Sequence, residues 1–309
     1  MKSGVTFGIA PQQLHAGYDE LLALWKLADD LGYDCGWMPD HFLPLAGDEE
    51  GPYLEEWTTT TALAMQARHM RVGPLVLGNT FRNPGIVAKM GAALDIVTGG
   101  RLEMGLGAAW FQREHRMYGI SFPPVSQRID MLGEALQVIR RLWTEPRVDF
   151  QGKHYTMTDA VCHPRPVQRP HPTLWVGGAG EKRTLRVIAQ YADGWNCSVD
   201  PEEYAHKLEV LKRHCDDAGT DVDAIQKSIY FVLGVHEDGD RAREIARETL
   251  GRFGVQVQKA LIAGTPGECV EQMGRFVELG VSHFIVELQP PYDHAGLELL
   301  AEKVMPELR

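Results

Sequence analysis

The stretch Trp37-Met38-Pro39-Asp40-His41-Phe42 closes an apolar run that begins at Asp34. Proline has no N–H to donate to a sheet ladder, so a strand over 34–38 is expected to stop at Pro39. An acid and an imidazole follow at once, just beyond the carboxyl end of the strand. In proteins that alternate strands and helices, catalytic groups usually lie at this position. The stretch therefore predicts a strand–helix repeat with functional side chains at its strand ends.

The composition is that of a folded protein rather than a nucleic-acid or membrane binder. The chain has 309 residues, 44% of them hydrophobic, which suffices for one large core or two ordinary domains. Its formal net charge of −11 argues against general binding to nucleic acid or anionic membranes. It lacks both the run of about 18 apolar residues that a membrane span needs and a secretory signal pattern. The five cysteines form no C-x-x-C pair, so we expect a cytoplasmic protein without a zinc site or a disulfide framework.

Strand-like and helical segments alternate along most of the chain. We expect strands over 5–9, 34–38, 71–77, 101–106, 173–176, 193–197, 226–235 and 282–288. We expect helices over 18–31, 57–68, 84–98, 126–143, 182–192, 201–217, 240–252, 255–262, 265–279 and from 294 to the end. Eight strands, mostly separated by helices, predict an α/β protein with a (β/α)8 TIM barrel. The rival is a doubly wound sheet, which is weakened because no G-x-G-x-x-G follows the first strand.

Two segments interrupt this repeat. The loop 42–56 is longer than the usual connection and is rich in glycine, proline and acids, so it is a candidate lid. Residues 108–172 combine a helix, a small hairpin turning at Gly152 and a proline-rich extended segment. We expect 108–172 to be an insertion over the carboxyl-terminal mouth of the barrel, and 1–309 to form a single domain.

The strand ends of a barrel would bring polar side chains to one mouth. His41 is a candidate for hydrogen bonding or proton transfer, the alternative being a loop histidine bonded to a backbone carbonyl. Asp40 could orient His41, bind a ligand or cap the next turn. No H-x-H or H-x-x-x-H pair includes His41, so no metal site is predicted. The absence of G-x-S-x-G removes an esterase-type nucleophile elbow.

Two loops of small residues, each followed by cationic side chains, indicate an anionic cofactor. Gly177-Gly178-Ala179-Gly180 precedes a predicted helix, where a phosphate could approach helix-terminal N–H groups. Gly105-Leu106-Gly107-Ala108-Ala109 precedes Trp110. Such glycine turns also occur without any phosphate, so both interpretations stay open. Four aromatic residues could line a flat ring or simply pack in the core: Trp37, Trp57, Phe81 and Trp110.

Five motifs in this order resemble the luciferase-like monooxygenase superfamily, and most closely its branch that uses the deazaflavin coenzyme F420. The resemblance covers essentially the whole chain. The motifs are Pro39-Asp40-His41-Phe42, Thr80-Phe81-Arg82-Asn83-Pro84, Asp95-Ile96-Val97-Thr98-Gly99-Gly100-Arg101, Gly105-Leu106-Gly107-Ala108-Ala109-Trp110, and Gly177-Gly178-Ala179-Gly180 through Ala192-Asp193-Gly194-Trp195-Asn196.

The resemblance implies the residues of a cofactor site. Asp40 and His41 would lie against the deazaflavin ring, and His41 would stabilise or exchange charge with the ring during hydride transfer. A non-proline cis peptide bond at Leu75-Val76, or the bond before it, would support the ring. Trp57 and Trp110 would border the substrate. The residues that would approach the cofactor phosphate are Gly107, Ala108, Gly177, Gly178 and Gly180.

The same resemblance implies an oxidoreductase that moves a hydride between F420 and a small organic substrate. It also implies a homodimer, with a flavin or F420 reductase as a further partner. Trp110 stands where a sugar-phosphate dehydrogenase of this branch has its acidic glutamate, which puts that proton donor and a sugar-phosphate substrate in doubt. Three alternatives stay open: a two-component monooxygenase using flavin mononucleotide (FMN), a metal-dependent barrel hydrolase using Asp40 and His41, and a non-catalytic flavin-binding protein.

Overall fold

The computed structural model describes residues 4–252 and 260–309, and the chain divides into two compact units. Unit 1 comprises Met1–Arg71, Asn196–Glu209 and Gln226–Arg309, and unit 2 comprises Val72–Trp195 and Val210–Ile225. Both units are built from parallel strands that alternate with helices, as the sequence predicts.

Unit 1 is organised around a parallel sheet. Its strands are β1 (Thr6–Pro11), β2 (Cys35–Met38), β10 (Gln226–Val235), β11 (Ala260–Gly264) and β12 (His283–Leu288). They pair in the order β2-β1-β12-β10, with β11 beside β10. Gly8 of β1 lies opposite Cys35 of β2, so β1 and β2 end at the same edge of the sheet.

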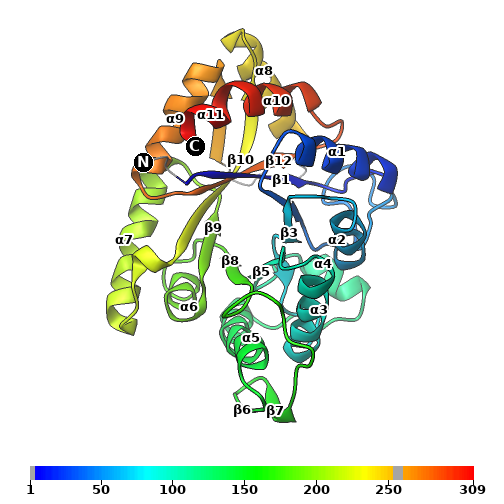
Figure 1. The fold of residues 1–309 in the computed structure, drawn as a ribbon, viewed down its shortest axis with the longest axis vertical. Helices are drawn as coiled ribbons and strands as arrows, with labels where there is room; N and C mark the ends of the chain where they lie inside the picture. Colours follow the sequence, from blue (N-terminus) through cyan, green and yellow to red (C-terminus); the bar gives the residue numbers. More distant parts are fainter. Residues whose placement is uncertain (1–3, 253–259) are drawn as a thin grey trace. The chain divides into compact units, whose positions relative to one another are not determined.

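The helices of unit 1 cover one face of this sheet. They are α1 (Tyr18–Asp30), α2 (Glu56–Ala64), α8 (Gly239–Gly251), α9 (Pro266–Glu278), α10 (His294–Leu299), a π-helical turn (Leu300–Val304) and α11 (Met305–Leu308). Figure 1 shows α1, α9, α10 and α11 along one side of β1 and β12. On that side the rings of Phe7 and Phe284 stack at 5.7 Å, and Arg309 lies over Phe7. Because side chains alternate along a strand, Thr6 and His283 point to the opposite face.

Unit 2 contains a second set of parallel strands that are packed against helices. The strands are β4 (Leu77–Gly78), β5 (Glu103–Gly107) and β8 (Thr173–Gly177). The helices are α3 (Pro84–Val97), the short α4 (Gln112–Met117), α5 (Val125–Thr144) and α6 (Thr184–Tyr191). Helix α5 packs between α3 and α6, and Trp143 Nε1 donates to the Ala88 carbonyl at 2.8 Å. The elements at sequence boundaries between the units are β3 (Arg71–Pro74), β9 (Gly194–Cys197), α7 (Pro201–Ala218) and a 3-10 turn (Val222–Ala224).

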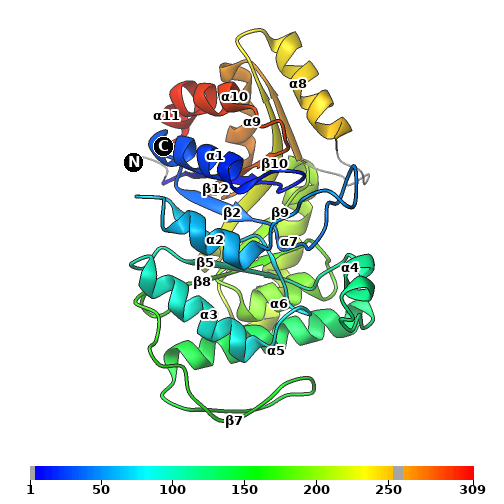
Figure 2. The ribbon, with the colours of Figure 1, turned by 90° about the vertical axis from the view of Figure 1, so that its right-hand side faces the viewer.

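The segment 108–172 contains three different structures. Helix α4 follows β5, α5 is a regular helix of the repeat, and β6 (Val148–Gln151) with β7 (Thr156–Ala160) forms the predicted hairpin. The Glu134 carboxylate of α5 accepts the backbone N–H groups of the hairpin turn, Lys153, His154 and Tyr155, at 2.8–2.9 Å. Figure 2 shows the hairpin extending beyond α5. The hairpin is therefore anchored along a helix of its own unit.

Several predicted element bounds need correction. The strand expected over 71–77 is divided into β3 and β4, the helix expected from residue 182 begins at Thr184, and the helix expected over 57–68 ends at Ala64. The helix expected over 255–262 is wrong where it is described, because Ala260–Gly264 is strand β11; residues 253–259 lie outside the described part. Burial alternates along β11 with a period of two, and five residues are too short for sequence periodicity to separate strand from helix. Within the described ranges, no helix is long and apolar enough to cross a membrane.

Candidate functional site

Asp40 and His41 lie directly after β2, where the sequence places them. Strand β2 ends at Met38, and Asp40 is 3% exposed whereas His41 is half-buried. The two residues therefore combine a buried carboxylate with an imidazole that solvent or a ligand can reach. This arrangement suits proton exchange or orientation of a bound ring.

Trp37, one of the four candidate ring-lining aromatics, is a core residue. It is fully buried, and its Nε1 donates to Nε2 of His283 at 3.0 Å. This bond makes Nε2 the acceptor, so Nδ1 carries the proton and donates to Thr6 Oγ1 at 2.8 Å. Burial lowers the pKa of His283 to about 4, which keeps the ring neutral at physiological pH. Trp37 thus anchors β2 to β12 in the interior.

Trp57 lies in the first turn of α2 and is half-buried. Glu55 caps this helix, because its carboxylate accepts from the N–H groups of Trp57 and Thr58 at 3.1 and 2.7 Å. The cap fixes the start of α2 and leaves the indole of Trp57 partly accessible, as a substrate-side residue requires.

The peptide bond Leu75-Val76 is cis, which confirms the predicted backbone feature at that bond. Val76 lies against the carboxyl ends of β5 and β8. A Cβ added at Gly107 would lie 2.6 Å from Val76 Cγ2, and one added at Gly177 would lie 3.1 Å from Val76 Cγ1. Gly105 is still tighter, with Pro74 O at 2.3 Å. The small residues of both predicted loops therefore make room for the bulge at Val76.

The loop after β8 is held by its own unit. Gly178 has a φ of +136°, a conformation that favours glycine, and its carbonyl accepts from Trp195 Nε1 at 2.8 Å. A Cβ added at Gly180 would lie 2.9 Å from Thr184 Oγ1. Helix α6 begins at Thr184, and its N-cap residue Arg183 makes no side-chain capping bond. The start of α6 is thus a glycine-lined helix terminus that no side chain of the cap covers.

Arg183, a cationic residue that follows this loop, forms an ion pair with Asp130. Arg183 Nη1 donates to Asp130 Oδ1 at 2.8 Å, and both side chains are partly exposed. This ion pair joins α6 to α5, so Arg183 is a weaker candidate for phosphate than the sequence pattern indicates.

Ala108 is fixed by Arg128, which sequence reasoning missed. Arg128 Nε donates to the Ala108 carbonyl at 3.1 Å and Nη1 to the Pro123 carbonyl at 2.6 Å, while the guanidinium lies 3.8 Å from the Phe122 ring centroid. The arginine is 7% exposed, and burial lowers its pKa. The available signal was its position on the apolar face of the predicted helix, four residues before Leu132.

Trp110 lies at the start of the loop toward α4 and is 52% exposed. Ala109 before it has a φ of +57°, and the Trp110 ring contacts Phe111 at 5.2 Å. This exposure is consistent with a side chain that contacts substrate. A second residue missed from the sequence is Tyr155 of the hairpin, whose hydroxyl accepts from Asn79 Nδ2 at 3.2 Å after β4.

No group of three His, Cys, Asp or Glu side chains in the described part of the chain is arranged to hold a metal ion.

The chain is similar to known proteins both in its fold and in its sequence. Solved structures match this chain over its whole length: an F420-dependent secondary alcohol dehydrogenase (TM-score 0.83, 24% identity, 100% of both chains) and the F420-dependent tetrahydromethanopterin reductase of Methanopyrus kandleri (TM-score 0.82, 20% identity, 99% of both chains). The protein therefore has their (β/α)8 barrel fold. The family model for luciferase-like monooxygenases matches residues 1–256, so the chain belongs to this family.

Among the family's curated members, similar proteins are named F420-dependent glucose-6-phosphate dehydrogenase. The protein of Microbacterium testaceum is 28% identical over 98% of this chain and 97% of its own length. That of Kineococcus radiotolerans is 30% identical over 76% of this chain and 72% of its own. The match to the F420-using branch thus extends along nearly the whole chain.

Proposed function

We propose that this protein is an F420-dependent oxidoreductase that transfers a hydride between the deazaflavin and a small organic substrate. The observation that carries the proposal is the near full-length similarity to relatives named for F420. The geometry supports it, because the cis bond at Leu75-Val76 and the glycines beneath Val76 are features expected of a ring-binding bulge.

We assign the residues as follows. Leu75 and Val76 would support the ring, and Asp40 with His41 would lie along it. The open start of α6 suits a phosphate, since helix-terminal N–H groups favour an anion. Backbone near the phosphate would come from Gly107, Ala108, Gly177, Gly178 and Gly180, and the substrate would lie toward Trp57 and Trp110.

When bound, F420 supplies a ring carbon that accepts or donates a hydride. His41 would take the hydroxyl proton of an alcohol as the hydride leaves its carbon, or return the proton in the opposite direction. Asp40, buried beside it, would favour the protonated imidazole that results. Trp57 and Trp110 would exclude water from the substrate side.

Two alternative functions are the FMN-dependent monooxygenase, which the family membership supports, and the metal-dependent hydrolase, which it does not. An FMN-dependent two-component monooxygenase belongs to the same family and would rely on a separate flavin reductase. A metal-dependent hydrolase gains no support within the described ranges, because no three metal-ligating side chains gather there. For the assembly, we propose a cytoplasmic homodimer in which 1–309 forms one luciferase-like domain.

The test is to titrate F420 and FMN separately into purified protein and to follow intrinsic tryptophan fluorescence. Tight binding of F420 with weak binding of FMN is the expected result. The reverse preference would favour the monooxygenase, and binding of neither would remove the proposal. A non-catalytic binder would bind F420 but turn over no acceptor or donor.

A further inference from the structure

The loop 42–56, which its length marks as a candidate lid, connects two residues of the proposed site in unit 1. It begins directly after His41 and leads to Trp57 in the first turn of α2. Strand β2 fixes the chain just before the loop, and the Glu55 carboxylate caps α2 at its far end. Residues 47–50 in the middle of the loop are exposed. The contacts that hold this middle part therefore decide where the loop lies.

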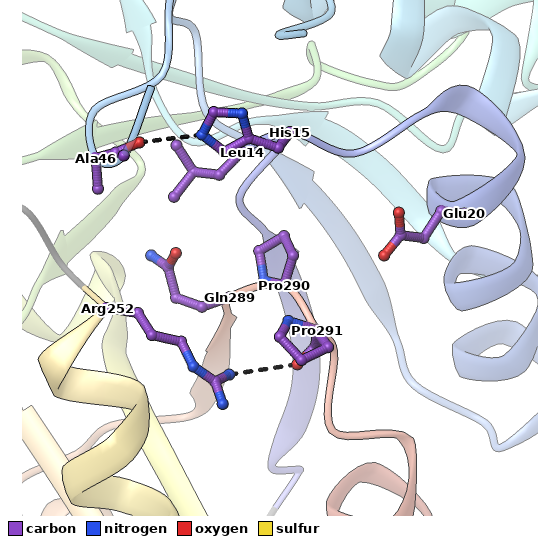
Figure 3. A pocket seen from close by; sticks show the side chains of 9 residues that line it. Leu14, His15, Glu20, Ala46, Arg252, Gln289, Pro290 and Pro291 are labelled. Atoms are coloured by element: carbon purple, nitrogen blue, oxygen red, sulfur yellow. Dashed lines mark hydrogen bonds between the residues drawn. The ribbon is translucent and has the colours of Figure 1, made fainter. Parts of the chain in front are cut away.

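His15, which follows β1, holds the middle of the loop through both its backbone and its ring. The His15 N–H donates to the Pro52 carbonyl at 3.0 Å. Figure 3 shows the imidazole beside Ala46, where Nε2 donates to the Ala46 carbonyl at 3.3 Å. The two acceptors lie on either side of the exposed residues 47–50. His15 thus bonds both arms of the loop and ties them to the end of β1.

The loop has glycine at the two positions against which the imidazole lies. A Cβ added at Gly47 would lie 2.9 Å from His15 Nε2, and one added at Gly51 would overlap Nδ1 and Cε1 of the same ring. The turn between these glycines has bonds of its own, because the Gly51 and Glu50 N–H groups donate to the Asp48 carbonyl and carboxylate at 3.1 and 3.0 Å. The loop is therefore a preformed turn with a space that fits the ring of His15.

The backbone of His15 is itself unusual. Its φ is +55°, in the left-handed region that residues with a side chain seldom adopt. Such a conformation persists where surrounding contacts enforce it, and it is often found where a segment clamps a ligand or switches. At His15 the bonds to Ala46 and Pro52 are the contacts that hold it.

The loop held in this way forms one wall of a pocket of about 390 Å³ at the carboxyl ends of β1 and β12. Ala46, Gly47 and His15 lie on this wall, and Gln289 and Pro290 after β12 lie across from it (Figure 3). Displacement of the loop would remove the wall, so the contacts of His15 control access to the space behind it.

We infer that His15 is a positioning residue for the proposed reaction: it latches the loop 42–56 as a closed lid between His41 and Trp57, and thereby slows release of the bound cofactor. The loop is joined directly to both residues, so its displacement would open the site on the side where they lie. Closed lids exclude water and retain ligands in this way. The inference rests on the proposed function, which places the cofactor ring along His41.

Three variants test the latch. His15→Ala removes the ring bond and keeps the backbone N–H, whereas His15→Gln offers an amide N–H at a similar reach and should restore the latch. Gly51→Ala displaces the ring while His15 itself is kept. The matched control is Gly267→Ala in α9, where an added Cβ would meet no heavy atom of the described structure within 4 Å.

Hydrogen-exchange mass spectrometry on the protein without ligand measures how often the loop opens. In peptides from 42–55 we expect about tenfold faster exchange for His15→Ala and Gly51→Ala, which corresponds to the loss of about one hydrogen bond. His15→Gln and Gly267→Ala should stay close to the unmodified protein. The double variant His15→Ala/Gly51→Ala should also exchange about tenfold faster rather than about a hundredfold, because both changes remove the same contact.

Release of F420 is measured on the loaded protein by stopped-flow dilution, followed by tryptophan fluorescence. We expect about tenfold faster dissociation from His15→Ala and Gly51→Ala, with His15→Gln close to the unmodified protein. The Tm of each variant is measured alongside and should change little, because the middle of the loop is exposed.

Unchanged exchange in His15→Ala, no recovery in His15→Gln, or a hundredfold effect in the double variant would overturn the latch. Faster exchange with unchanged F420 release would overturn the lid and leave the proposed function intact. Failure of the unmodified protein to bind F420 would instead remove the proposed function and the lid with it, while the exchange measured without ligand would still decide whether His15 latches the loop.

Discussion

At the residue scale, two histidines of unit 1 have opposite environments. His41 is half-buried directly after β2, whereas His283 is nearly buried and bonded on both ring nitrogens. The accessible ring can exchange a proton with a ligand, and the enclosed ring is held neutral. The sequence identified His41 from its place after a strand, but nothing in the neighbourhood of His283 along the chain indicates its two partners.

We expect His41→Ala to slow hydride transfer by about 100-fold or more, because loss of a positioned proton-transfer group typically costs at least this factor. The dissociation constant for F420 should change much less. Single-turnover absorbance measurements separate the two effects. The control is His69→Ala, an exposed histidine of the same unit, and an unchanged single-turnover rate in His41→Ala would remove this residue from the mechanism.

His283 should make the folding stability depend on pH. Its pKa falls from 6.5 to about 4 on folding, so between these values the unfolded chain binds a proton that the folded protein does not. Stability should be retained above pH 6.5 and lost as the pH falls toward 4, by roughly 3 kcal/mol. Urea unfolding across this pH range measures the slope, which His283→Asn should flatten.

At the element scale, the bulge at Leu75-Val76 packs against the carboxyl ends of β5 and β8. Sequence reasoning treated the glycines of these strand ends as phosphate contacts, and the structure adds that Gly105, Gly107 and Gly177 accommodate Val76. The bulge itself was expected only from the family resemblance. Its packing on these glycines is a contact between segments distant in sequence, which no local pattern reports.

A double-mutant cycle tests this packing. Gly107→Ala places a methyl group near Val76 Cγ2 and should destabilise the protein by about 1–3 kcal/mol, the usual cost of overpacking. Val76→Ala in the same chain should relieve the clash, so the two changes should be coupled by about 0.5–3 kcal/mol. Denaturant unfolding provides the free energies. Strictly additive effects would contradict the contact.

Helix α9, which the sequence predicts over 265–279, begins with a capping box. The Thr265 hydroxyl accepts from the Glu268 N–H, and the Glu268 carboxylate accepts from the Thr265 N–H at 2.7 Å. Thr265→Ala should therefore cost about 1 kcal/mol of stability. Thr58→Ala serves as the control, since Thr58 is exposed and its backbone N–H keeps the Glu55 cap. Equal unfolding midpoints for the two variants would refute the capping role.

At the scale of the whole molecule, the similarity to F420-dependent proteins extends over nearly the full chain. Binding of the cofactor should accordingly raise the stability of the whole folded protein. A ligand that binds only the folded state at 100 times its dissociation constant adds about 2.7 kcal/mol to the stability. We expect saturating F420 to raise Tm by several degrees and the same concentration of FMN to raise it less. A larger shift with FMN would favour the monooxygenase alternative.

The sequence by itself determined the alternation of strands and helices, the position of Asp40 and His41, and the glycine-rich strand ends. These are local properties, set by side-chain periodicity, by the missing N–H of Pro39 and by turn residues. Only the tertiary structure decided that Ala260–Gly264 is a strand and that Arg128 fixes Ala108. Each of these depends on a contact between segments far apart in the chain, and such contacts form only when the strands pair and the helices pack.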